Sequence, residues 1–245
     1  MALVTKLSNG VIGQVATIST EGSSTSGTGT YSIEYEFGSL TGVIKDNISP
    51  TNVPATISWT IPTSFYGEIP ANATSKTGKL ISYFTFLGKK EVNSTSTFIA
   101  KIPDGDAPTI TASVITTDAL SSQLSGNTST IINGVSNVKV TMSATPTQGS
   151  TIVNQYFYYQ RNYYPMNGVA NKTLTGGYNG IFEFGAIDTR NRTGSKIVTL
   201  TAIDYKRPSI SLNNVSISTS GVATISVSGT WFNGSFGATA NTLTV

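Results

Sequence analysis

The chain has 245 residues, of which only 11% are charged, and its 15 Lys and Arg against 12 Asp and Glu give a formal net charge of +3. Globular domains usually carry about 25% charged residues, so this chain draws its polarity mainly from Ser, Thr, Asn and Gly. A hydrophobic content of 38% with so small a net charge argues against disorder. The basic residues are scattered, which argues against nucleic-acid binding.

The sequence contains neither cysteine nor histidine. This excludes disulfides, thiolate nucleophiles, zinc sites with nitrogen or sulfur ligands, and acid–base catalysis by histidine. Asp104 and Asp106 alone do not supply the six to eight oxygens that calcium needs, so we expect no metal and no cofactor. The first 20 residues lack the apolar core of a secretory signal, and no run reaches the ~20 apolar residues of a membrane span.

Alternation of apolar and polar residues is the main periodic pattern, and it predicts strands. The clearest alternating runs are residues 30–37, 55–61, 98–102 and 138–144. Clusters rich in Gly, Asn, Ser and Pro separate them, as turns do in all-β chains. No stretch of ten or more residues shows a helical period. The sequence therefore predicts an all-β protein made of β-sandwiches.

The segment "ATISWTIPTSFYGEIP", residues 55–70, combines a Trp, a Phe and a Tyr with two prolines. Its alternation places Ala55, Ile57, Trp59 and Ile61 on one face, so we expect Trp59 to lie in a sandwich core with Ile57 and Ile61. Phe65 and Tyr66 follow the turn that Pro62 begins and can fold over the end of that core. A sugar-binding platform and part of an active site are the alternative interpretations of these aromatics.

An internal repeat suggests the domain organisation. Pro108 and Pro208 each stand directly before an alternating run, 100 residues apart, which is the length of an immunoglobulin-like sandwich. We predict one domain at 1–105, with residues 1–30 as a candidate attachment segment, and a second at 106–206. Residues 207–245 would begin a third, incomplete domain. The junctions are too short for flexible linkers, so we expect the domains to form a rod.

The third domain would have strands near 209–217, 221–230 and 238–245, whereas a sandwich of this class has about seven. Three strands would leave apolar side chains uncovered. We therefore expect the native chain to continue past Val245; strands donated by neighbouring subunits are the alternative.

The segment "QYFYYQRNYYP" is the best binding candidate. If Phe157 and Tyr159 point inward with Val153, then Tyr156 and Tyr158 point outward, and we expect Tyr163 and Tyr164 to cap the following loop. Exposed tyrosines bury large areas at low entropic cost. They would serve either as a contact with another subunit or domain, or as a platform for sugar rings.

A catalytic role finds little support. Glycosidases need two carboxylates on either side of one bond, with one pKa raised by its surroundings. Glu34 and Glu36 share a strand face, but that face points to solvent. Asp188 and Asp204 stand at strand ends, where capping a turn is the usual role. We expect no enzymatic activity.

Four segments together resemble a known family: "ISWTIPTSFYGEIPANATSKTGKLISYFTF", "LSGNTSTIINGVSNVKVTMSAT", "GIFEFGAIDTRNRTG" and "DYKRPSI". In this order they are similar to the minor structural proteins of long-tailed phages of Gram-positive bacteria. That family carries a Trp-Thr-Ile-Pro strand, a Leu-Thr-Gly-Asn-like turn, an Asp-Ser-Arg-Gly-like turn and a Tyr-x-x-Pro. The turns at Leu124–Asn127 and Asp188–Asn191 depart from the family pattern in detail.

The resemblance implies tandem Ig-like domains in a virion component of the tail tip, baseplate or a fibre. Such a protein would be made in the host cytoplasm and released by lysis, without an export signal. Its partners would be other tail proteins and copies of itself, with host cell-wall carbohydrate as a further partner. The alternatives are a carbohydrate-binding adhesin module that recognises a host receptor and, less favoured, a polysaccharide depolymerase.

Overall fold

The computed structural model describes residues 3–22 and 28–240. The chain divides into two compact units. The first unit comprises residues 1–109, 145–153 and 187–193, and the second comprises residues 110–144, 154–186 and 194–245. The finer division of the sequence at residues 105 and 206 stays a prediction.

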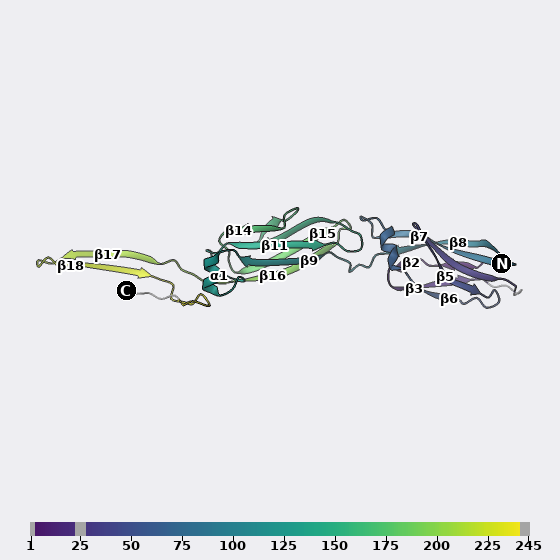
Figure 1. Cartoon of the computed structure of the whole chain (residues 1–245), viewed down its shortest axis with the longest axis horizontal. Helices are drawn as coiled ribbons and strands as arrows, with labels where there is room; N and C mark the ends of the chain where they lie inside the picture. The colour runs from purple at the N-terminus through teal and green to yellow at the C-terminus, as the bar shows by residue number, and fades with distance from the viewer. Residues whose placement is uncertain (1–2, 23–27, 241–245) are drawn as a thin grey trace. The chain divides into compact units, whose positions relative to one another are not determined.

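The first sandwich consists of two sheets that belong to the first unit (Figure 1). Its three-stranded sheet has the order β1 (Val4–Lys6), β3 (Val15–Glu21) and β6 (Thr56–Thr60). Its five-stranded sheet has the order β2 (Asn9–Val11), β8 (Lys89–Lys101), β7 (Ser75–Phe86), β4 (Thr30–Phe37) and β5 (Leu40–Ile48). The 3₁₀ helix η1 (Thr63–Glu68) follows β6.

The second sandwich repeats this architecture, and its core lies in the second unit. Its three-stranded sheet has the order β14 (Asn171–Leu174), β11 (Val138–Thr145) and β9 (Thr109–Thr116). Its five-stranded sheet has the order β10 (Thr130–Ile132), β16 (Thr193–Ile203), β15 (Gly180–Asp188), β12 (Ile152–Tyr159) and β13 (Asn162–Pro165).

The two sandwiches have the same strand order when their strands are counted from the start of each. Strands one, three and six form the small sheet in both, and strands two, eight, seven, four and five form the large one. In both, the short second strand pairs in parallel with the last strand, β2 with β8 and β10 with β16. This arrangement is a variant of the immunoglobulin sandwich. The predicted fold of tandem Ig-like β-sandwiches is therefore confirmed.

Aromatic rings fill the first core, because the alternating strands turn them toward the space between the sheets. Phe37 and Phe65 stack with centroids 4.1 Å apart, and Trp59 meets Phe98 edge-to-face at 5.3 Å. Gly78 makes room for them, since a Cβ there would lie 2.6 Å from Phe98 and 2.8 Å from Phe37. The core thus selects a glycine inside a strand, which is otherwise unfavourable.

The predicted core residues Ile57, Trp59 and Ile61 all belong to this cluster, with exposed fractions of 8%, 8% and 0%. The prediction for Ala55 was wrong. It is exposed, because β6 begins only at Thr56 and Ala55 lies in the preceding turn region. Phe65 is fully buried in η1, where it closes the core as expected.

Phenylalanine and tyrosine fill the second core as well. Tyr159 stacks on Phe182 with centroids 4.0 Å apart, and Phe157 packs against Phe182 and Phe184. Val138, with an exposed fraction of 0%, covers the same core from the small sheet. Val153 was predicted to point inward with Phe157, but it is 54% exposed.

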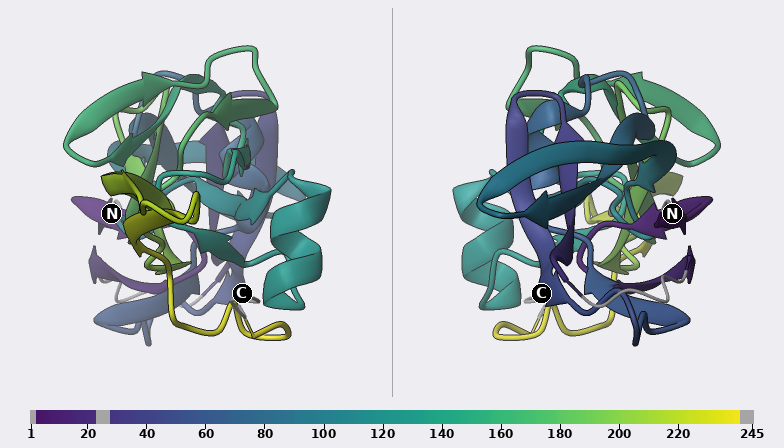
Figure 2. Two further views of the ribbon diagram at one scale, coloured as in Figure 1. Left: turned by 90° about the vertical axis from the view of Figure 1, so that its left-hand side faces the viewer. Right: turned by 90° about the vertical axis from the view of Figure 1, so that its right-hand side faces the viewer.

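A short helix, α1 (Ala119–Ser125), was not predicted; Figure 2 shows it in teal. Seven residues are too few for a clear period, yet the helix ends at Gly126, whose φ of 78° is the left-handed conformation usual after a helix. In the described part of the chain, no helix is long and apolar enough to cross a membrane.

Two further strands, β17 (Ser209–Ile217) and β18 (Ala223–Thr230), pair into an antiparallel ribbon (Figure 1). Every residue of the ribbon is exposed. Cross-strand pairs such as Leu212 with Val227 and Val215 with Ile225 give it one apolar face. The third strand expected at 238–245 lies mostly outside the described residues, and Ala240 forms only an isolated bridge with Ser235.

The packing of Trp59 yields a first prediction. Trp59→Ala should lower the free energy of unfolding by about 3–5 kcal/mol, because it removes a buried ring that touches Phe65 and Phe98 and leaves a cavity. Val15→Ala on the same sheet should change stability by less than about 0.5 kcal/mol, since Val15 is 68% exposed. Chemical denaturation measures both, and equal stability of the two variants would contradict a core role for Trp59.

Candidate functional site

The aromatic segment singled out in the sequence forms a β-hairpin. β12 and β13 pair in register, with Tyr158 opposite Tyr163 and Phe157 opposite Tyr164. Because directly opposite residues share a face, Tyr158 and Tyr163 lie on one face of the hairpin, and Tyr164 lies on the other. The prediction that Tyr163 and Tyr164 cap a loop was therefore wrong, since both lie in β13.

The outward face carries three tyrosines, here called the outer tyrosine cluster: Tyr156, Tyr158 and Tyr163. Their ring centroids lie 5.4–5.6 Å apart. Tyr158 and Tyr163 are 43% and 46% exposed. Tyr156 lies over Gly185 of β15, where any Cβ would collide with its ring. These contacts fix the three rings in place, so the cluster forms an ordered aromatic surface on the second unit.

Tyr164 does not belong to this cluster. Its ring stacks on the buried Phe157 with centroids 4.7 Å apart, on the other face of the hairpin. Lys172 places its Nζ 5.3 Å from the centroid of the Tyr164 ring. The four tyrosines predicted as one binding surface are therefore divided, three on one face and one on the other.

A cleft opens beside Tyr164, in the second unit. Its volume is about 570 Å³. Its lining residues come from the end of the hairpin, from β14 and from the loop that follows β14: Tyr159, Gln160, Asn162, Tyr164, Thr173, Leu174, Thr175, Gly176, Gly177 and Tyr178. We call this the Tyr164 cleft.

Sequence reasoning missed this cleft. Tyr159 was predicted only to point inward to the core, and no role was predicted for Tyr178. The hydroxyl of Tyr159 donates to the carbonyl of Tyr178 at 2.6 Å and accepts from its backbone N–H at 2.7 Å. Residues 175–180 form the cluster "TGGYNG", whose glycines are typical of a turn, but nothing in the sequence shows that this turn meets the hairpin.

Two arginines organise a polar cluster in the first unit. Arg190 is only 6% exposed, and its guanidinium donates to the carbonyls of Ala73 at 2.8 Å, Thr147 at 3.1 Å and Gln148 at 2.7 Å. Arg192 donates to the carbonyl of Asp106 at 3.1 Å. Arg190 thus joins backbone carbonyls of two segments that lie far apart in the sequence.

The "DTRNR" turn holds these arginines in place. Oδ1 of Asp188 accepts from the backbone N–H groups of Arg190 and Arg192, both at 2.9 Å. Burial lowers the pKa of Arg190, as does the charge of Arg192, while Asp188 raises it. Asp188 was predicted to cap a turn at a strand end, and it does so. The geometry describes a structural brace rather than a catalytic site.

Burial also raises the pKa of Tyr66 in this cluster, and the charge of Asp106 adds to the effect. The Tyr66 hydroxyl lies 3.4 Å from the Asp106 carboxylate. Tyrosine is protonated at neutral pH even at its ordinary pKa, so the Tyr66 hydroxyl donates to the Asp106 carboxylate here.

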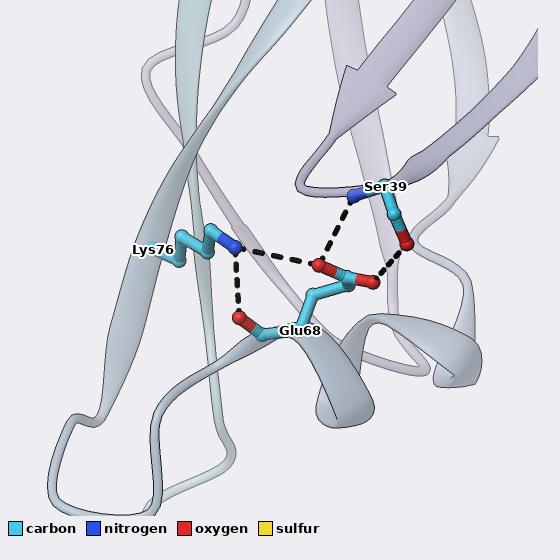
Figure 3. A network of polar contacts seen from close by, with 3 residues as sticks. All are labelled: Ser39, Glu68 and Lys76. Carbon is cyan, nitrogen blue, oxygen red and sulfur yellow. Dashed lines mark hydrogen bonds and ion pairs between the residues drawn. The ribbon is translucent and has the colours of Figure 1, made fainter.

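Glu68 at the end of η1 bridges to the turn between β4 and β5 (Figure 3). It accepts from the Ser39 hydroxyl at 2.5 Å and from the Ser39 backbone N–H at 3.1 Å. Lys76 contacts Oε2 of Glu68 at 3.4 Å. The pKa of Glu68 is lowered, first by the Ser39 hydroxyl, then by the Ser39 N–H and by Lys76. The cause is local and structural, as at a capped turn.

The other carboxylates considered for catalysis are paired with lysines or amides. Glu34 forms an ion pair with Lys90, and Glu36 with Lys79 at 3.2 Å. Asp204 accepts from the Asn133 side chain at 2.9 Å. Among residues 3–22 and 28–240, no group of three or more acidic side chains is placed to hold a metal ion.

A family described as "Siphovirus protein of unknown function (DUF859)" matches residues 2–230. No curated protein matches the sequence.

Solved structures with weak overall similarity contain fibronectin and Ig domains. The fibronectin(III)-like modules of CbhA from Clostridium thermocellum share 15% identity, with 82% of this chain and 94% of that chain covered and a TM-score of 0.29. The FN1–FN3 domains of chicken CNTN1 share 8% identity, with 82% of this chain and 67% of that chain covered and a TM-score of 0.28. Dpr2 Ig1–Ig2 in complex with DIP-Theta Ig1–Ig3 shares 11% identity, with 86% of this chain and 68% of that chain covered and a TM-score of 0.30.

The arginine brace generates a prediction for stability. Arg190→Ala should lower the free energy of unfolding by about 1–3 kcal/mol, because it removes the charged donor of hydrogen bonds to three backbone carbonyls. Arg190→Lys should restore only part of this, since an ammonium cannot reproduce the planar fork that reaches three carbonyls. Denaturant unfolding with both variants tests this, and full stability in Arg190→Ala would remove the brace from the account.

Glu68 generates a prediction for pH dependence. Its folded pKa lies below the ordinary value of 4.5, so its contribution to stability is fully present above pH ~4.5 and disappears as the pH falls through the folded pKa. The stability gap between wild type and Glu68→Gln should therefore close on acidification. Ser39→Ala should reduce the same pH dependence, because Ser39 is its largest cause. Thermal melts from pH 7 to pH 2 measure this, and a gap that stays constant would refute it.

Proposed function

Because the chain belongs to the siphovirus family that matches residues 2–230, we propose that it is a structural protein of the phage tail. Its place is the tail tip, the baseplate or a fibre, where it contributes to host attachment. It is made in the host cytoplasm and reaches the outside by lysis, within the particle.

The observation that carries this proposal is the repetition of one sandwich architecture within a phage protein. Tandem sandwiches place surfaces along a chain and need no reactive group to do so. The described residues whose pKa is shifted also support a structural role. Arg190, Tyr66 and Glu68 all use their side chains to hold loops or turns in place. Function on such a fold resides in its surfaces.

The outer tyrosine cluster is our candidate for the contact with neighbouring subunits. Tyrosine is enriched at protein–protein contacts, where its ring packs and its hydroxyl keeps a hydrogen bond. Ile181 and Ile197, which are 52% and 66% exposed, come from the same five-stranded sheet. We propose that this surface packs against other tail proteins or against a second copy, so that the chain is held as a homo-oligomer.

The second candidate is a carbohydrate-binding adhesin module. The Tyr164 cleft favours it, because the cleft combines tyrosines with amide and hydroxyl groups. The two functions are compatible, since a tail protein can both support the particle and adhere. A polysaccharide depolymerase is the least favoured candidate, because Glu34 and Glu36 are each engaged by a lysine.

Immunogold electron microscopy of purified particles tests the proposed location, with antibody raised against this chain. We expect label on the tail, concentrated at its distal end. Label restricted to the head, or found only in the soluble lysate, would refute the proposal.

Complementation tests the proposed contact. Particles grown with Tyr158→Ala and Tyr163→Ala should incorporate less of the chain, while the purified variants keep the wild-type melting temperature because both rings are exposed. Tyr178→Ala is the matched control, since Tyr178 is similarly exposed, at 53%, but does not belong to the cluster. Equal incorporation of all three variants would exclude the outer tyrosine cluster as the contact.

A further inference from the structure

We infer that the Tyr164 cleft binds a neutral saccharide; this rests on the attachment role proposed above and gives it a site and a ligand class. The cleft volume of about 570 Å³ falls within the ~300–1,000 Å³ of typical ligand sites. It is separate from the outer tyrosine cluster, which lies on the opposite face of the same hairpin.

The walls of the cleft are fixed before any ligand arrives. The buried Tyr159 hydroxyl holds both backbone groups of Tyr178. Gly177 donates to the carbonyl of Ser136 and accepts from Gly134, both at 2.8 Å. A Cβ on Gly177 would lie 2.8 Å from Ile131, so the loop lies tightly on the core. A preformed wall reduces the entropy lost on binding, which matters for a weakly held ligand.

Two aromatic rings offer stacking surfaces. Tyr164 is supported from behind by Phe157. Tyr178 is 53% exposed, and its ring lies beside Gly134, 3.5 Å from where a Cβ would stand. A tyrosine ring has an apolar body and a polar tip, so it can pack on the C–H face of a pyranose while its hydroxyl bonds to the sugar.

The remaining lining supplies hydrogen bonds of both kinds. Gln160 and Asn162 contribute amides, and Thr173 and Thr175 contribute hydroxyls. Each of these groups both donates and accepts. Sugar hydroxyls also do both, so this lining matches a polyhydroxylated ligand better than a purely apolar one.

Charge decides between a neutral and an anionic ligand. None of the ten lining residues is charged. Recognition of phosphate or carboxylate groups relies on Arg or Lys donors, and frequently on bidentate Arg. The ammonium of Lys172 lies 5.3 Å from the centroid of the Tyr164 ring, where the ring already engages it, and none of the ten lining residues adds a second cation or a bidentate Arg. The lining therefore favours a neutral saccharide over a phosphate polymer.

The test uses the purified full chain and titration calorimetry. The first probe is neutral polysaccharide from the host cell wall, freed of phosphate polymers, and the second is polyglycerol phosphate. We expect binding to the first probe only. Tyr164→Ala and Tyr178→Ala should each weaken it by about three- to tenfold, the value of one ring contact. Tyr158→Ala, on the opposite face, should leave it unchanged.

Tyr178→Ala decides the matter if Tyr164→Ala unfolds, because Tyr164 supports Phe157 whereas Tyr178 is largely exposed. Failure to bind the neutral polysaccharide, preference for polyglycerol phosphate, or equal weakening by Tyr158→Ala would overturn the inference. If the tail carries immunogold label but the chain binds no neutral saccharide, only this inference fails. If the chain binds but the tail is unlabelled, the proposed location fails and the cleft stands.

Discussion

The burial of aromatic rings between two sheets is the constraint on which both sandwiches depend. The chain has no cysteine, so no disulfide can staple it, and exposed ion pairs such as Lys6–Glu21 and Lys79–Glu36 contribute little to its stability. The stacked rings of Phe37 and Phe65 in one core, and of Tyr159 and Phe182 in the other, have to supply the stability. Gly78 shows how closely the backbone is fitted to these rings, since no side chain fits there.

Because the side chains between the two sheets form each core, the outer faces of the sheets are available for other roles. The hairpin of β12 and β13 illustrates this, since Phe157 and Tyr159 turn inward and anchor it while Tyr158 and Tyr163 remain exposed. One hairpin can therefore present a subunit contact on one face and a ligand cleft on the other. The polar clusters around Arg190 and Glu68 hold loops in place without competing for these faces. This division between core and surface supports an assembly role.

The strands could be predicted because their periodicity is local, as the buried Ile57, Trp59 and Ile61 illustrate. The turn of the hairpin could not. Gln160 and Arg161 form its two-residue turn, and both have positive φ, at 50° and 62°. Such turns usually contain Asn-Gly, so the sequence Gln-Arg gave no indication of one. The cleft was missed for a different reason. Residues 159–164 and 173–178 meet only through tertiary packing, which no periodicity reports.

Hydrogen–deuterium exchange on the full-length chain tests most directly the claim that aromatic cores hold the structure. Strands that carry core rings, such as β8 with Phe98 and β15 with Phe182, should exchange slowest, because opening them exposes a whole core. β17 and β18 pair equally well, but every residue is exposed, so their amides should exchange quickly. Protection of β17 and β18 equal to that of β8 and β15 would contradict the account.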